Sequence, residues 1–173
     1  YAEKLQLGIN NIGLIDAPEV ENPFDLRLIE PLITKWQKSF DWEYGGAARA
    51  PKFMMPTNLN FLQSYGVYKN KPELVQYVDL TLTKMAYGGL FDVVDGGFSR
   101  YSVDVRWHIP HFEKMLYDNG QLLQTYASAY KRTKNALYKT ICHKTFNFIK
   151  EKWIINNGLV QSAYDADSLD ASE

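Results

Sequence analysis

Apolar residues recur at intervals of three and four along most of this 173-residue chain. That spacing brings side chains to one face of an α-helix. The pattern is found in five segments, at residues 26–40, 58–65, 74–85, 112–130 and 137–153. Alternation typical of a β-strand is weak and is confined to residues 98–103, where a short hairpin arm is expected. The sequence therefore predicts an all-α chain with long, structured connections between its helices.

Proline and glycine mark where these helices begin and end. Pro56 and Pro72 open the second and third segments, because the missing N–H of proline would have no partner in a first helical turn. Pro110 is placed in the same way at the start of the fourth segment. Pro31 interrupts the first segment, so that helix either begins or kinks there. Gly88-Gly89 is expected to end the third helix.

Two loops of the chain resemble each other. DWEYGGAAR at 41–49 and DVVDGGFSR at 92–100 share an acid, a Gly-Gly pair and an arginine three residues after the second glycine. A proline and an aromatic-rich helix follow each loop, and a weaker third copy begins at Asn156. Gly-Gly could merely end helices, but the recurring arginine, proline and helix favour a repeat of helical hairpins. Such units stack to bury a shared face, which predicts about half of an α/α toroid.

Composition narrows the function classes. The net charge is −1 and no block of like charge occurs, so neither nucleic acid nor a membrane surface is predicted as a partner. The single Cys142 has no CxxC partner and occupies an apolar helical position, where a core role is expected. Aromatic residues make up 14% of the chain, which suits a large core or a sugar-stacking cleft. A cytoplasmic location is expected, and the start at Tyr1 suggests a fragment or a processed product.

Four segments carry a specific resemblance to a known protein family. They are GGAARAPKF, GGFSRYSVD, the block around PHFEKMLYDN, and SAYDADS. Over residues 24–169 the chain resembles the thioredoxin-domain-containing family of the spermatogenesis-associated type. The resemblance implies a region similar to six-hairpin glycosidases and N-acylglucosamine 2-epimerases, and hence a partial α/α toroid. Residues 1–23 would then be a linker from an upstream thioredoxin-like domain, and residues 24–173 the first half of the toroid. Gly120 stands where alanine is expected for this family.

The block RWHIPHFEKMLYDNGQLL, residues 106–123, is the densest in polar chemistry. On a helix that begins at Pro110, one stripe would be formed by His111, Lys114, Asp118 and Gln121. His111 could act as a general base or bind a sugar hydroxyl, because its reference pKa lies near neutrality. Alternatively it caps a helix, while Glu113 and Lys114 form ordinary surface pairs. His108 and His111 lack a nearby third ligand, so no metal site is predicted.

A second group of candidates lies in YDADS. Asp165 and Asp167 could include the catalytic acid or base that a glycosidase needs, or they could cap a turn. The catalytic candidates are His111, Asp118, Asp165 and Asp167. The substrate-binding candidates are Arg100, Tyr101, Trp107, Lys52, Asn119 and Tyr164. Each has a structural alternative: Arg100 could hold a loop carboxylate, Lys52 could be an ordinary surface lysine, the aromatics could cover the core, and a buried Asn119 must find amide partners.

Two functional classes remain open on the sequence. The first is a carbohydrate-binding or carbohydrate-processing domain, either an epimerase that removes the proton α to an aldehyde or a hydrolase with two carboxylates. The second is a non-catalytic scaffold that docks the thioredoxin-like domain or a protein partner. No cofactor is predicted in either case. An uncovered inner face of a half ring would predict self-association.

Overall fold

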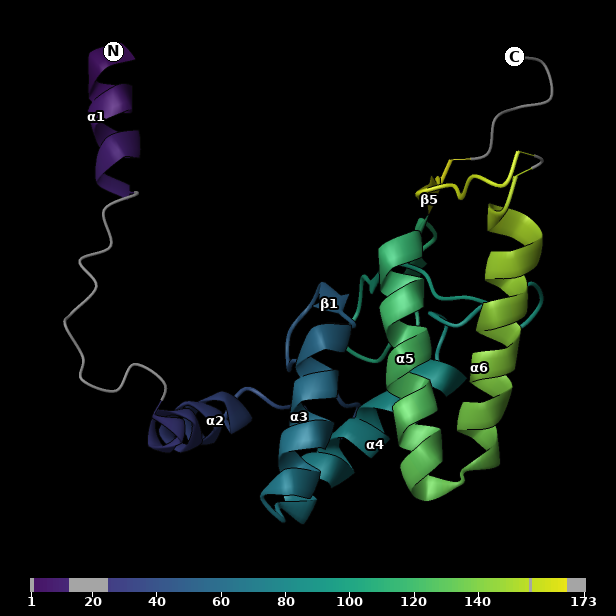
Figure 1. Cartoon of the computed structure of the whole chain (residues 1–173), viewed down its shortest axis with the longest axis horizontal. Helices are drawn as coiled ribbons and strands as arrows, with labels where there is room; N and C mark the ends of the chain where they lie inside the picture. Colours follow the sequence, from purple (N-terminus) through teal and green to yellow (C-terminus); the bar gives the residue numbers. More distant parts are fainter. Residues whose placement is uncertain (1, 13–24, 156, 168–173) are drawn as a thin grey trace. The chain divides into compact units, whose positions relative to one another are not determined.

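The computed structural model describes residues 2–12, 25–155 and 157–167 (Figure 1). The chain divides into two compact units, Tyr1–Gln37 and Lys38–Glu173. The first unit contains helix α1 (Ala2–Ile12), a 3-10 turn (Leu26–Leu28) and helix α2 (Ile29–Gln37). The Asp25 carboxylate accepts the Arg27 N–H at 2.8 Å. Helix α2 therefore begins before Pro31, which falls in its first turn.

The second unit is built from two helical hairpins. Helices α3 (Pro56–Tyr68) and α4 (Pro72–Tyr87) form the first, and α5 (Leu116–Thr133) and α6 (Ala136–Phe148) form the second. A π-helical turn (Ile149–Trp153) continues α6. The two hairpins lie side by side, with α3 against α5 and α4 against α6 (Figure 1). Together with α2, these helices confirm all five predicted helical segments, apart from the start of α5.

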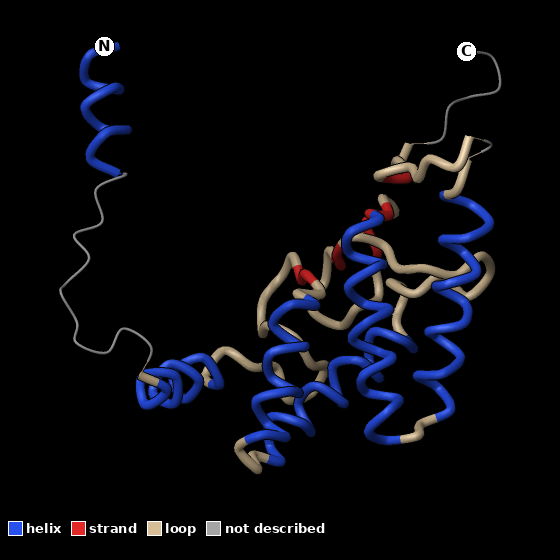
Figure 2. Tube along the Cα trace, in the orientation of Figure 1, coloured by secondary structure: helices blue, strands red, loops and turns tan. Residues whose placement is uncertain are grey.

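Five short strands accompany the long connections (Figure 2). Strands β1 (Lys52–Phe53), β2 (Tyr101–Ser102) and β3 (Pro110–His111) form one antiparallel sheet, in the order β1-β2-β3. Strands β4 (Lys114–Met115) and β5 (Ala163–Tyr164) form a second antiparallel pair. The predicted hairpin arm at 98–103 is confirmed by β2. Because β1 precedes α3 and β4 precedes α5, both sheets lie at the helix ends opposite the short turns that close the hairpins.

The core lies between the hairpins and is apolar, with a few polar groups that join the helices. Its fully buried side chains include Leu62, Leu74, Leu82, Met85, Leu122, Tyr126 and Tyr138. The Tyr126 hydroxyl donates to the Leu82 carbonyl at 2.7 Å, and the Tyr138 hydroxyl donates to the Asp79 carbonyl at 3.0 Å. Arg132 pairs with the Asp79 carboxylate, with one N–H at 2.9 Å. These contacts link α4, α5 and α6 and hold the connections that carry the candidate site.

Candidate functional site

The predicted repeat of the two Gly-Gly loops is confirmed by their hydrogen bonds. In the first loop, Asp41 N–H donates to the Gly46 carbonyl at 2.9 Å, and Gly45 N–H donates to the Asp41 carbonyl at 2.9 Å. In the second loop, Asp92 makes the same two bonds with Gly97 and Gly96, at 2.9 and 3.0 Å. The aspartate side chain of each loop also accepts two backbone N–H groups of the loop itself. Each loop is thus a closed turn organised by one carboxylate.

A lysine from a following strand closes each loop. Lys52 donates to Asp41 at 2.8 Å and to the carbonyls of Gly45 and Val105 at 2.7 Å each. Lys114 donates to Asp92 at 2.8 Å and to the Gly96 carbonyl at 2.9 Å. Burial would raise the carboxyl pKa of both aspartates, but the lysine and the backbone N–H groups outweigh it and lower the pKa. The ion pairs therefore belong to the architecture of the repeat.

The repeated cation is a lysine rather than the predicted arginine. Lys52 follows Gly46 by six residues, whereas Lys114 follows Gly97 by seventeen, because the β2–β3 hairpin is inserted in between. That unequal spacing hid the correspondence in the sequence. Lys52 is fully buried and its three hydrogens are all accepted by the protein. This geometry gives the predicted substrate-binding role of Lys52 no support.

The predicted helix start at Pro110 is wrong, because residues 110–115 are extended and α5 begins at Leu116. Asp104 explains the difference: its carboxylate accepts the N–H groups of Arg106, His108 and Ile109 and so closes the β2–β3 turn. Pro110 pairs with Ser102 in that hairpin. The stripe of His111, Lys114, Asp118 and Gln121 therefore does not exist.

Alternation along this extended segment separates its side chains onto two faces. His111 packs edge-on against Tyr101, with ring centroids 4.6 Å apart. Glu113 accepts from Arg100 at 2.8 Å. We use the name polar face for two groups taken together, the Tyr101–His111 ring pair and the Arg100–Glu113 ion pair with Asp118. Glu113 and Lys114 both form ion pairs with the second Gly-Gly loop, Glu113 with Arg100 and Lys114 with Asp92, so they secure that loop rather than forming ordinary surface pairs.

Within the polar face, Asp118 has the pKa that departs most from its ordinary value. It lies in the first turn of α5 and is half-buried. Burial raises the pKa of its carboxyl to about 6; the positive charge of Arg100 opposes this and the negative charge of Glu113 adds to it. A carboxyl with this pKa is partly protonated near neutral pH. It can therefore donate a proton, which an ordinary surface aspartate does poorly.

Two predicted substrate-binding residues are instead internal to the protein. Asn119 is fully buried, accepts the Phe98 N–H at 2.7 Å, and donates to the carbonyls of Phe98 and Met115 at 3.0 Å each. The prediction that a buried amide would find partners here is confirmed. Trp107 is also fully buried; its indole N–H donates to the Tyr44 carbonyl at 2.7 Å and its ring lies 4.9 Å from the Lys52 ammonium. Both residues hold loops in place.

The C-terminal candidates lie on and after β5. Tyr164 pairs with Lys114 in the β4–β5 ladder, and its hydroxyl donates to the Lys152 carbonyl at 2.8 Å. Asp165 and Asp167 are exposed, and Asp165 accepts the Asp167 N–H at 3.3 Å. Among the described residues, neither aspartate contacts the polar face. Their catalytic role stays a prediction.

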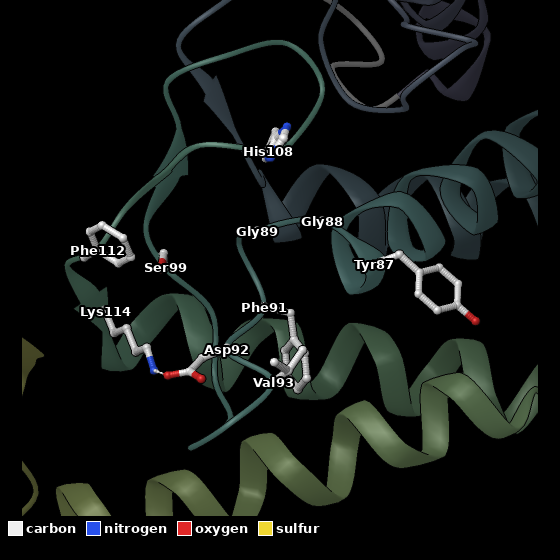
Figure 3. A pocket seen from close by; sticks show the side chains of 10 residues that line it. All are labelled: Tyr87, Gly88, Gly89, Phe91, Asp92, Val93, Ser99, His108, Phe112 and Lys114. Carbon is white, nitrogen blue, oxygen red and sulfur yellow. Dashed lines mark hydrogen bonds and ion pairs between the residues drawn. The ribbon is translucent and has the colours of Figure 1, made fainter.

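A pocket of about 540 Å³ opens on the other face of the extended segment (Figure 3). Its lining combines the end of α4 with the second Gly-Gly loop and consists of Tyr87, Gly88, Gly89, Phe91, Asp92, Val93, Ser99, His108, Phe112 and Lys114. His108, Phe112 and Lys114 alternate with the residues of the polar face. A search for helical periodicity could not reveal this pocket. An alternation of side chains between two faces in WHIPHFEK, as in a strand, would have indicated it.

Two further observations limit the chemistry. Within the described residues, no three histidine, cysteine or acidic side chains come together as a metal site would require. None of the described helices is long and apolar enough to cross a membrane. Cys142 is half-buried and its thiol lies 3.9 Å from the Leu123 carbonyl, so it is a partly covered helix residue.

Curated relatives share most of this chain. Spermatogenesis-associated protein 20 of Rattus norvegicus is 42% identical over 135 residues, which are 76% of this chain and 17% of that protein. The Homo sapiens protein of the same name is 40% identical over 135 residues, with the same two coverages. An uncharacterized protein of Caenorhabditis elegans is 42% identical over 139 residues, 77% of this chain and 19% of its own length. The predicted resemblance is confirmed.

The chain spans less than a fifth of the length of these spermatogenesis-associated relatives. No protein-family model matches it. The upstream thioredoxin-like domain therefore stays a prediction that follows from the resemblance.

Solved structures settle the fold. A sugar epimerase from a ruminal bacterium superposes with a TM-score of 0.69 at 18% identity, over 78% of this chain and 37% of that one. Cellobiose 2-epimerase from Spirochaeta thermophila gives 0.67 at 16%, over 86% and 42%. An unsaturated glucuronyl hydrolase specific for heparin gives 0.64 at 15%, over 80% and 42%. The chain folds as part of an α/α toroid, as predicted.

Proposed function

We propose that the polar face is part of a carbohydrate-processing site in which Asp118 is the proton donor. The observation that carries the proposal is the half-buried Asp118 carboxyl with a pKa of about 6. General acids work best when their pKa lies near the working pH, and burial is the usual means of raising that of a carboxyl. The sugar-acting proteins that share the fold support the choice of substrate class.

The neighbours of Asp118 suit the recognition of hydroxyl groups. Arg100 is held by Glu113 through one N–H at 2.8 Å and is part-exposed, which leaves other guanidinium hydrogens for a ligand. Tyr101 packs at a tilt against Phe53, with ring centroids 4.8 Å apart, and edge-on against His111, with centroids 4.6 Å apart. These aromatic and imidazole rings offer apolar surface beside polar donors, as sugar sites do.

The reaction can be of two types. In hydrolysis, Asp118 would protonate the leaving oxygen while a second carboxylate acts at the sugar carbon. In epimerisation, Asp118 would return a proton to the carbon from which a base has removed one. Both need a partner group on the opposite side of the sugar. Asp165 and Asp167 stay candidates for that partner. Another candidate is a residue outside this chain, since the relatives are much longer than it.

A scaffold is the competing function. It is favoured by the way Lys52, Asn119 and Trp107 satisfy their polar groups within the protein. In that case the loops would only secure the toroid. The polar face favours the carbohydrate-processing function, because carboxyls with perturbed pKa values are concentrated at functional sites.

Saturation-transfer NMR of the full-length protein against neutral and acidic monosaccharides and disaccharides tests the sugar site. His111→Ala and Arg100→Ala should each abolish most of the transfer to the sugar bound at the polar face. His143→Ala is the matched control, because His143 is an exposed histidine on α6. Equal transfer in the wild type, His111→Ala and Arg100→Ala would reject the polar face as a sugar site.

A further inference from the structure

We propose a second, separate ligand site in the pocket behind the polar face, suited to one neutral monosaccharide ring. It goes beyond the proposed acid site because none of its lining residues belongs to the polar face. The volume of about 540 Å³ lies within the range of roughly 300–1,000 Å³ that is usual for small-molecule sites.

Strand geometry makes the two sites distinct. Ser99 lines the pocket, whereas the next residue, Arg100, pairs with Glu113 on the polar face. His108 and Phe112 line the pocket, whereas His111 packs on Tyr101. Because His111 and Glu113 alternate with Phe112 and Lys114, the extended segment 111–114 supplies residues to both sites. A substitution on one face should therefore leave the other face intact.

The charge of the pocket favours a neutral ligand. Its two charged side chains, Lys114 and Asp92, form an ion pair at 2.8 Å (Figure 3). Asp92 also accepts two backbone N–H groups, and Lys114 also donates to the Gly96 carbonyl. The pair is thus neutral overall, and most of its hydrogen-bonding groups already bond to the protein. An anionic ligand would find no uncompensated cation here.

The remaining groups suit a ring that carries hydroxyls. Phe112 is 69% exposed, an unusual exposure for a phenylalanine, and its ring lies beside Ser99 at one wall of the pocket (Figure 3). Phe91 contributes a buried apolar surface. Ser99 is only 3% exposed, and it belongs to the lining of the pocket. His108 is exposed and also belongs to the lining.

This combination fits a sugar better than an apolar molecule. An aromatic wall stacks on the apolar face of a sugar ring, while a hydroxyl and an imidazole can donate to and accept from the sugar hydroxyls. The Ser99 hydroxyl in the lining can both donate a hydrogen bond to a ligand hydroxyl and accept one from it. Gly88 and Gly89 leave no room for a side chain beside His108 and Trp107, so the end wall is backbone.

The test is saturation-transfer NMR of the full-length protein with glucose, mannose, galactose and N-acetylglucosamine as probes. Phe112→Ala should weaken binding of the preferred probe about three- to tenfold, the usual value of one aromatic stacking contact. Ser99→Ala should weaken it as well, and it removes only one oxygen from a residue that makes its backbone bond to Leu90 in either form. Phe146→Ala, which removes an exposed phenylalanine of α6, is the matched control and should leave this binding unchanged. Circular dichroism confirms that each variant is folded.

Three outcomes overturn this second site. They are unchanged binding in both Phe112→Ala and Ser99→Ala, loss of all sugar binding in His111→Ala alone, and no transfer to any neutral probe in the wild type. The proposed acid site is judged separately, by His111→Ala, Arg100→Ala and the behaviour of Asp118. Either site can therefore fail while the other stands.

Discussion

At the scale of single residues, burial decides which candidate side chains are available for chemistry. Lys52 is fully buried and saturated by protein acceptors, whereas Asp118 is half-buried and keeps a raised pKa. The residues next to Lys52 and Asp118 in the sequence do not show which of the two is used up by protein contacts and which is available for chemistry. Lys52 is enclosed by Asp41, Gly45 and Val105, and a partner 53 residues away cannot be read from local pattern.

Lys52→Met should destabilise the protein strongly. Removal of the ammonium leaves the nearly buried Asp41 carboxylate without its cation, which typically costs about 3–5 kcal/mol. Chemical denaturation at pH 7 measures the change. Lys139→Met on the exposed surface of α6 is the control and should alter stability by less than about 0.5 kcal/mol. A small effect of Lys52→Met would show that this ion pair does not secure the loop.

Asp118 should affect stability with a pH dependence opposite to that of an ordinary ion-paired acid. Its pKa is about 6 in the folded protein against 3.8 as the reference value. Between about pH 4 and 6 the folded state holds a proton that the unfolded state has lost, so this group lowers stability as the pH rises. Asp118→Asn should flatten that slope and make the protein more stable than the wild type at pH 7.

Denaturation midpoints at pH 4.5 and 7 measure the effect of Asp118→Asn. Asp41 and Asp92 provide the contrast: their lowered pKa values stabilise the folded state above about pH 4, and that contribution is lost as the pH falls. A wild type and an Asp118→Asn variant with parallel pH profiles would contradict the raised pKa.

At the scale of elements, local patterns predicted the helices and long-range pairing decided what they missed. The interval of three and four, with Pro56, Pro72 and the Gly88-Gly89 stop, was enough for α3 and α4. The start of α5 was misplaced because the β2–β3 hairpin and Asp104 hold Pro110 in a strand. Helix α1 was not predicted either, although Leu5, Ile9 and Ile12 recur at intervals of four and three along it.

The Gly-Gly loops make close packing contacts that only glycine permits. Gly97 has a φ of +78°, and a Cβ there would lie 2.6 Å from the Phe148 ring. Gly97→Ala should therefore cost about 1–3 kcal/mol in stability. Gly120→Ala is the matched control in α5, where no atom lies within 4 Å of the added methyl. It should stabilise the protein by about 0.5–1 kcal/mol, and thermal denaturation of both variants provides the comparison.

The opposite order of these two glycine variants would contradict the packing of the second loop on Phe148. Gly120 is also the position where the family resemblance leads to an expectation of alanine. Stabilisation by Gly120→Ala would therefore fit both the open space and the resemblance.

At the scale of the whole molecule, the chain supplies part of an α/α toroid. Its match covers 37–42% of the length of three solved structures with this fold. The long connections gather at one end of the helical hairpins and carry the polar face and the pocket. The sequence predicted this fold and named His111, Arg100, Tyr101 and Asp118 as site candidates, whose role in binding or catalysis stays a prediction. It did not predict Glu113, Ser99 or Phe112, because their roles depend on the extended form of residues 108–114.

The central claim is that Asp118 donates a proton to a sugar, and turnover measures it most directly. The full-length protein is incubated in D₂O with aldoses and with glycosides, and ¹H NMR follows both deuterium incorporation and bond cleavage. Asp118→Asn should lower the rate at least about 100-fold, the usual contribution of a general acid. Asp95→Asn is the control and should keep the full rate, because Asp95 is an exposed residue of the second Gly-Gly loop. Full turnover in Asp118→Asn would contradict the assignment, and no turnover by the wild type on any sugar would favour the scaffold.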